Sequence, residues 1–182
     1  IVQLADEDTL RGELSTYLES LNISLNKVDI VKCRHNIINA IIYSKACEAR
    51  DTAINFKYHI EDIEELPMKA YEVSEVLSNL LNNAFEEVAK ETNIEKVVEL
   101  SIIENKNDLI IEVKNTLCES KNIRTDKLFK KGYSTKNRGS GYGLYNVKKI
   151  VEENKGKLMV TLDSGTISFT VKFANNRVLL AQ

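Results

Sequence analysis

Glycines gather around a Ser-Thr-Lys tripeptide in residues 128–147, which read LFKKGYSTKNRGSGYGLYNV. Four of the seven glycines of the chain lie here, namely Gly132, Gly139, Gly141 and Gly143. The last three form a Gly-x-Gly-x-Gly run that passes directly into a helical pattern. Glycine allows the backbone to approach a ligand closely, and the first N–H groups of a helix are unpaired donors at the positive end of its dipole. These residues therefore predict a phosphate-binding loop.

The glycine run differs from two familiar nucleotide-binding loops. A P-loop ends in Gly-Lys-Ser or Gly-Lys-Thr, whose side chains hold phosphate and magnesium, and neither sequence follows these glycines. A dinucleotide fingerprint belongs to regular βαβ alternation, which the order of elements expected below does not provide. A metal ion bound with the phosphates must therefore find its protein ligands elsewhere in the chain.

Three asparagines, Asn79, Asn82 and Asn83, lie in the middle of a strong helical pattern. Asparagine is a poor interior helix residue because its side chain competes for backbone hydrogen bonds. Asn79 and Asn83 lie one helical turn apart, on the side opposite the apolar residues, so their amide oxygens can point the same way. Amide and phosphate oxygens are ligands that Mg²⁺ accepts. The simpler alternative is a solvated polar face, on which Glu75 and Glu86 are ordinary surface charges or order water around a metal.

Composition narrows the class of protein but not its function. The 182 residues are 43% hydrophobic and 29% charged, which suits one globular domain with an appended element. The formal net charge of −2 gives no indication of a nucleic-acid partner, and we expect none. Three cysteines without metal-type spacing fit a reducing compartment. The sequence contains no membrane-length apolar run and no recognisable targeting signal, so a cytoplasmic location is expected for this chain.

Apolar spacing predicts the elements that must position these groups. Helical spacing covers residues 6–25, 31–52, 68–90 and 142–153, and strand alternation covers 54–60, 96–103, 108–114, 157–162 and 166–173. Residues 115–126 lack periodicity and are predicted to form a loop. The short turns between the later strands require antiparallel hairpins. The expected fold is an α/β (α+β) two-layer sandwich, in which helices cover one face of a mixed, mostly antiparallel sheet.

Four signatures together resemble the GHKL ATP-binding superfamily, which has the Bergerat-type fold. They are LSNLLNNAFE at 77–86, FKKGYSTK at 129–136, GSGYGL at 139–144 and GTISF at 165–169, and they occur in the family's order. Within the superfamily the chain looks most like the catalytic domain of sensor histidine kinases of the quorum-sensing, accessory-gene-regulator branch. The first glycine box of most relatives is absent, Asn115-Thr116 stands at that strand's end as in this branch, and IIYSK at 41–45 is also similar.

The resemblance implies roles for the helix asparagines. Asn83 would be the magnesium ligand that links the triphosphate of ATP to the helix. Asn79 would support the metal or the phosphates one turn earlier. Hydrolytic members of the superfamily carry a glutamate at the position of Asn79, where it acts as a base toward water. Its absence favours a kinase over a hydrolase.

The same resemblance assigns the remaining nucleotide contacts. Gly139, Gly141 and Gly143 would wrap the phosphates as a lid, with Leu144 next to the last glycine and Lys136 adding positive charge. Asn115 would replace the adenine-reading aspartate of the family, and an amide both accepts and donates hydrogen bonds. Thr166 would be the second adenine contact. The aromatic residues Phe129 and Tyr133 would close over the site or pack beneath the lid.

The resemblance also predicts how the chain is divided and what it works with. Residues 1–30 would be a helical stub from a dimerisation hairpin, 31–174 the ATP-binding domain and 175–182 a tail. The phosphoacceptor histidine would lie on dimerisation helices of the same parent protein, before Ile1. The parent would be a membrane-anchored homodimer that serves a response regulator.

His35 is a second candidate acceptor, because Arg34-His35-Asn36 and Asn39 resemble the acceptor box of this branch. The spacing argues against it, since one helix alone separates His35 from the strand predicted at 54–60. Two other functions stay open: a serine kinase or ATPase of the same fold, and a nucleotide-binding scaffold without transfer activity. The asparagine at position 79 counts against hydrolysis, and Asn83 together with the glycines counts against an inactive scaffold.

Overall fold

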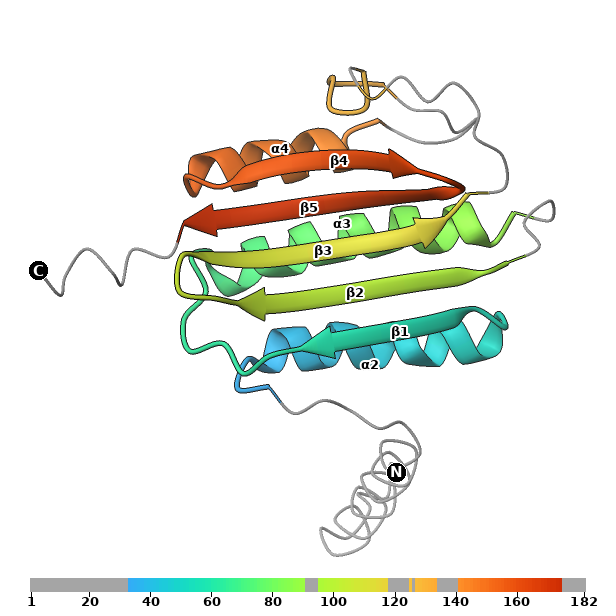
Figure 1. Ribbon diagram of the computed structural model, residues 1–182, viewed down its shortest axis with the longest axis horizontal. Coiled ribbons are helices and arrows are strands. Elements are labelled where there is room, and N and C mark those ends of the chain that lie inside the picture. The colour runs from blue at the N-terminus through green and yellow to red at the C-terminus, as the bar shows by residue number, and fades with distance from the viewer. Residues whose placement is uncertain (1–32, 91–94, 118–124, 126, 134–140, 175–182) are drawn as a thin grey trace, which may run out of the picture. The chain divides into compact units, whose positions relative to one another are not determined.

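The computed structural model describes residues 33–90, 95–117, 125, 127–133 and 141–174 (Figure 1). Its helices are α2 (Asn36–Asp51), α3 (Ala70–Val88) and α4 (Gly143–Glu153). Its strands are β1 (Asn55–Ile60), β2 (Val97–Glu104), β3 (Asp108–Thr116), β4 (Lys157–Asp163) and β5 (Thr166–Ala174). The stub and the tail predicted at 1–30 and 175–182 lie outside the described residues.

The five strands form one mixed sheet in the order β1-β2-β3-β5-β4. The edge strand β1 runs parallel to β2, and every other neighbouring pair is antiparallel. A parallel pair needs a crossover connection, which α3 provides between β1 and β2. The mixed, mostly antiparallel sheet predicted from the sequence is confirmed.

All three helices cover the same face of the sheet (Figure 1). α2 packs on β1, α3 on β2 and β3, and α4 on β4, while α3 also contacts both other helices. Because strand side chains alternate between faces, the face under the helices is apolar: Leu100 lies opposite Val113, and Val113 opposite Phe169. The other face carries ion pairs such as Lys57–Glu99 at 3.5 Å. The result is the predicted two-layer sandwich.

α3 is the central helix of the covered layer. Eight of its residues are buried, among them Leu77, Leu80, Leu81 and Phe85. The Phe85 ring meets the Phe56 ring of β1 edge-on, with 5.4 Å between ring centroids. Fully burying each such side chain contributes roughly 1.5–3 kcal/mol. Packing on both sides of the apolar stripe therefore fixes the direction in which the opposite, polar side of α3 faces.

Two predicted boundaries shift for physical reasons. α2 begins at Asn36, because His35 is extended and the backbone N–H and C=O of Cys33 are both bound by the Asn39 side chain, at 3.2 and 2.8 Å. β3 continues two residues into the predicted loop, because Asn115 and Thr116 pair with Ile167 and Thr166 of β5. None of the described helices is both long and apolar enough to cross a membrane.

Candidate functional site

The polar side of α3 holds the two asparagines predicted to bind metal and phosphate. Asn79 and Asn83 are both half-buried and lie one turn apart, whereas Asn82 is exposed. The Asn79 side-chain nitrogen donates to the Glu75 carbonyl at 2.8 Å. This bond fixes the amide plane and leaves the acceptor oxygen, Oδ1, turned away from its own helix.

The first turn of α4 lies against this amide. A Cβ atom added to Gly143 would stand 2.7 Å from Asn79 Oδ1, which is closer than real Cβ contacts. A larger residue here would therefore have to displace the Asn79 amide. Gly143 of the glycine run and Asn79 of α3, which are far apart in the sequence, thus lie side by side.

The beginning of α4 carries N–H donors that the helix itself does not pair. Tyr142 is the N-cap residue, and its side chain makes no capping hydrogen bond. The first backbone bond of the helix runs from the Asn146 N–H to the Tyr142 carbonyl at 2.8 Å. The N–H groups of Gly143, Leu144 and Tyr145 therefore have no partner inside the helix, and such a terminus attracts anions.

Two glycines join the ends of the predicted lid. The Gly132 N–H donates to the Gly141 carbonyl at 3.1 Å, and φ is +77° at Gly132 and +68° at Gly141. A Cβ atom at Gly141 would lie 2.5 Å from the carbonyl carbon of Gly132. Gly132 and Gly141, which stand on either side of residues 134–140, are therefore adjacent. Lys136 and Gly139, also predicted to contact the phosphates, lie outside the described residues.

The predicted adenine contacts, Asn115 and Thr166, lie at the carboxyl end of β3. Asn115 is on the helix-covered face and only 3% exposed, and its side chain donates to the Thr116 carbonyl at 2.8 Å. Thr166 is the partner of Thr116 across the ladder, and the Leu117 N–H extends the ladder to the Gly165 carbonyl at 2.7 Å. The two residues lie at one end of this strand pair, but Asn115 shares its face with Ile167, so strand alternation turns the Thr166 side chain to the opposite face of the sheet.

The aromatic residues near the lid contact the sheet and the helix start. The Phe129 ring meets the Phe169 ring of β5 edge-on, with 6.4 Å between centroids. The Lys131 ammonium stands 5.8 Å from the centroid of the Tyr142 ring. Phe129 thus packs against β5, and its predicted role at the lid stays a prediction.

Asn146 had no recognisable signal in the sequence. Its side-chain nitrogen donates to the Glu75 carboxylate at 3.0 Å and so joins α4 to α3. Glu75 was expected to be an ordinary surface charge, but it is half-buried and bonded to both Asn79 and Asn146. The two residues are 71 positions apart in the sequence, so their contact can be recognised only once α3 and α4 are known to pack together.

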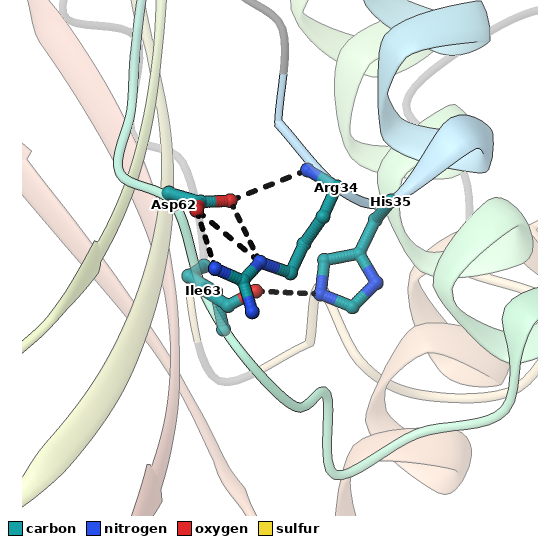
Figure 2. Close-up of polar contacts among 4 residues, drawn as sticks. All are labelled: Arg34, His35, Asp62 and Ile63. Atoms are coloured by element: carbon teal, nitrogen blue, oxygen red, sulfur yellow. Dashed lines mark hydrogen bonds and ion pairs between the residues drawn. The ribbon is translucent and has the colours of Figure 1, made fainter.

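His35 is engaged in a structural contact (Figure 2). Its Nε2 atom lies 2.9 Å from the Ile63 carbonyl, which can only accept, so Nε2 carries the proton. Beside it, the Arg34 guanidinium donates to the Asp62 carboxylate, with the shortest bond at 2.8 Å. Hydrogen bonds from Arg34 hold the pKa of Asp62 below its usual value. This arrangement agrees with the expectation that His35 is not the phosphoacceptor.

The groups of the site suit magnesium with a triphosphate better than a metal held by protein alone. Among the described residues, no group of three or more His, Cys, Asp or Glu side chains is placed to hold a metal. Amide oxygens of Asn79 and Asn83 would need phosphate oxygens to complete an oxygen shell. Gly143, beside Asn79, has no side chain to stand between its backbone and such a group.

Comparisons with known proteins agree with this description. The family model described as GHKL domain matches residues 68–174. "Sensor protein CitS" of Bacillus subtilis (strain 168) is 29% identical over 174 residues, covering 87% of this chain and 31% of CitS. "Sensor histidine kinase DpiB" of Escherichia coli (strain K12) is 28% identical over 134 residues, covering 69% of this chain and 24% of DpiB. The chain thus spans less than a third of these relatives.

The fold is also that of a solved kinase domain. The structure described as the catalytic domain of histidine kinase ThkA superposes with a TM-score of 0.64 at 20% identity, covering 79% of this chain and 93% of that one. The predicted fold class is confirmed, as is the prediction of an ATP-binding catalytic domain of the sensor-kinase kind. Because the family model covers more than half of the sequence, the chain belongs to the GHKL domain family.

Proposed function

We propose that this chain is the catalytic part of a sensor histidine kinase, which binds ATP with Mg²⁺ and supplies its γ-phosphoryl group to a histidine outside the chain. The observation that carries the proposal is the contact between Gly143 and Asn79. It places N–H groups that have no partner within their own helix beside an amide oxygen on α3. Donors for an anion and an acceptor for a cation therefore lie together, as magnesium triphosphate requires.

Asn83 would hold the magnesium ion, with Asn79 supporting the metal or a phosphate. When bound, the ion would neutralise negative charge on the phosphates. The N–H groups of Gly143 and Leu144 would donate to phosphate oxygens, and Asn115 and Thr166 would bind the adenine. Phosphoryl transfer asks little more of the protein than positioning and charge stabilisation.

Transfer is favoured over hydrolysis by the chemistry of Asn79. A carboxylate at this place could take a proton from water, whereas a neutral amide has no basic atom of comparable strength. The described part of the site offers Glu75 one turn earlier, but its carboxylate is bonded to Asn146. A serine kinase of the same fold remains the second candidate, because nothing in Asn79 or Asn83 selects the acceptor.

The quorum-sensing branch is a finer proposal. It is supported by Asn115-Thr116 at the end of β3, where most relatives carry a glycine box, and by the IIYSK segment in α2. One similar protein is named a probable C4-dicarboxylate sensor kinase. Autophosphorylation of the parent protein in membranes should respond to a peptide signal under our proposal. A response to dicarboxylates alone would contradict the branch.

The partners follow from the same proposal. The parent would be a membrane-anchored homodimer, its acceptor histidine would lie on dimerisation helices, and a response regulator would receive the phosphoryl group. The test is radiolabelled ATP with the parent chain, comparing wild type with Asn83→Ala. We expect an acid-labile phosphohistidine in the wild type and loss of label in the variant. Acid-stable label would favour the serine kinase, and unchanged label in the variant would contradict the metal assignment.

A further inference from the structure

We propose that Glu75 and Asn146 are positioning residues, which set the register of α4 against α3 and so hold the Gly143 backbone beside the Asn79 amide. The inference rests on the proposed function, because the aligned groups are those assigned to phosphate and magnesium. Neither residue is assigned to contact the nucleotide. Their role would be exerted through Asn79 and Gly143.

Two contacts join one face of α4 to one face of α3. Asn146 lies three residues after Gly143 on α4, and Glu75 lies four residues before Asn79 on α3, so each pair occupies one face of its helix. Gly143 touches Asn79, and Asn146 donates to Glu75 at 3.0 Å. The chain direction is opposite in the two helices (Figure 1). The two contacts are therefore successive cross-links along one antiparallel helix pair.

A third contact continues the same seam at the other end of α4. The Asn154 side chain, just after the helix, donates to the Ile150 carbonyl at 2.9 Å and lies near enough to Glu72, in the first turn of α3, to help lower the pKa of that carboxyl, after the larger effect of the Lys69 backbone N–H. Successive contacts along one line leave little freedom for α4 to slide or rotate. The pair nearest the site is Glu75–Asn146.

Apolar packing alone does not fix the position of α4 along α3. α4 buries Val147, Ile150 and Val151, and contacts between such side chains are not directional. A small slide of α4 along α3 would keep these residues buried while moving Gly143 away from Asn79. A hydrogen bond requires a particular distance and angle, so Asn146 can fix the register where apolar contacts do not.

Glu75 is suited to this role because it binds the side chains of both Asn79 and Asn146. Its carbonyl accepts from the Asn79 side chain at 2.8 Å, and its carboxylate accepts from Asn146. A single residue thus orients the amide on α3 and anchors the helix that carries the donors. Loss of the carboxylate should disturb the anchor without removing the carbonyl bond to Asn79.

The experiment compares four variants for binding of Mg²⁺-ATP by calorimetry. Asn146→Ala and Glu75→Leu remove the cross-link from either helix, Glu75→Gln retains an acceptor, and Lys149→Gln changes an exposed residue of α4 as a control. We expect the first two to raise the Kd about fivefold or more, the effect of losing one net hydrogen bond. The last two should stay within about twofold of wild type. Having both Asn146→Ala and Glu75→Leu guards against one of them failing to fold.

A second readout needs no nucleotide. In ¹⁵N-labelled protein, Asn146→Ala and Glu75→Leu should shift the backbone amide signal of Gly143 and the side-chain amide signal of Asn79, while Lys149→Gln leaves both unchanged. Folded variants with wild-type affinity and unshifted signals would overturn the positioning role. Absence of ATP binding by the wild type would instead overturn the proposed function, and the two signals would still decide whether the pair sets the register.

Discussion

Gly143 shows how one residue joins the two halves of the site. It lies so close to Asn79 that an added Cβ would stand 2.7 Å from Oδ1 and would have to push the amide aside. In a helix interior, glycine is less favourable than every residue except proline, by about 1 kcal/mol relative to alanine. At Gly143 the backbone lies directly against the Asn79 amide, which accounts for a glycine at this position.

Gly143→Ala should weaken binding of Mg²⁺-ATP without unfolding the protein. Alanine favours the helix, while its methyl group must push Asn79 aside, so affinity falls although the helix propensity improves. Calorimetry and thermal unfolding of the same sample separate these effects. Lys149→Ala is the control, because it changes an exposed residue of the same helix to alanine. Equal affinities for wild type and Gly143→Ala would contradict the contact.

Asp62 should make stability depend on pH in the acid range. Its pKa is lowered by hydrogen bonds from Arg34, so the folded state binds the proton less readily than the unfolded state. This contribution is present above the unfolded pKa of about 4 and is lost as the pH falls through the lower folded value. Asp62→Asn removes it, so urea unfolding of the variant and the wild type should differ at neutral pH and converge in acid. A difference that persists in acid would contradict the ion pair as its source.

At the scale of elements, α3 carries the site because its two sides do different work. The apolar side is buried by the sheet and by α2, and this burial fixes the orientation of the polar side with Asn79 and Asn83. Lys45 of α2 also contacts α3. Its ammonium lies 4.7 Å from the Phe85 ring centroid and 2.6 Å from the Glu48 carboxylate. Stability of this helix and geometry of the site are therefore coupled.

Phe85→Ala should be severely destabilising. The side chain is 2% exposed and contacts Phe56 and Lys45, and truncating a buried phenylalanine typically costs about 3–5 kcal/mol. Tyr71→Ala on the same helix is the matched aromatic control, because Tyr71 is 63% exposed and should change the free energy of unfolding by less than about 1 kcal/mol. Urea unfolding of both variants provides the comparison. Similar losses would show that burial in α3 does not decide stability.

Periodicity predicted these elements well because it reports which side of a helix or strand is buried. Alternation located β1, β2, β4 and β5 to within a residue or two, and helical spacing located α3 and α4. The beginning of α2 was missed, because it is set by Asn39 binding the backbone of Cys33. Such a contact depends on tertiary geometry and leaves no periodic signal. Glu75 and Asn146 escaped for the same reason, since each has an ordinary place in its own helix.

At the scale of the whole domain, the site draws on segments that the sheet order brings together. The central strands β3 and β5 bring Asn115 and Thr166 to one end, and α3 packs on β3, so the asparagines lie in the same covered layer. Local signatures predicted each part, and the family resemblance supplied their arrangement. In the described residues Gly143 lies against Asn79, whereas Asn115 and Thr166 share one end of the β3–β5 pair on opposite faces of the sheet.

Binding of Mg²⁺-ATP should stabilise the domain as a unit. A ligand that binds only the folded state adds about 2.7 kcal/mol at a concentration 100 times its Kd, so the melting temperature should rise with added nucleotide. ATP without magnesium should raise the melting temperature less, because no cation then links the phosphates to the amide oxygens of Asn79 and Asn83. GTP at the same concentration tests the adenine contacts and should have little effect. An equal rise with either nucleotide would contradict base recognition by Asn115 and Thr166.

The most direct test of the central claim is calorimetric titration of ATP with and without Mg²⁺ into wild type, Asn83→Ala and Asn82→Ala. The two variants make the same substitution at adjacent positions of α3, one half-buried on the site and one exposed. We predict magnesium-dependent binding by wild type and Asn82→Ala, and a Kd raised about tenfold or more by Asn83→Ala. Equal binding by the two variants, or binding indifferent to magnesium, would contradict the claim that α3 holds the metal of a magnesium nucleotide.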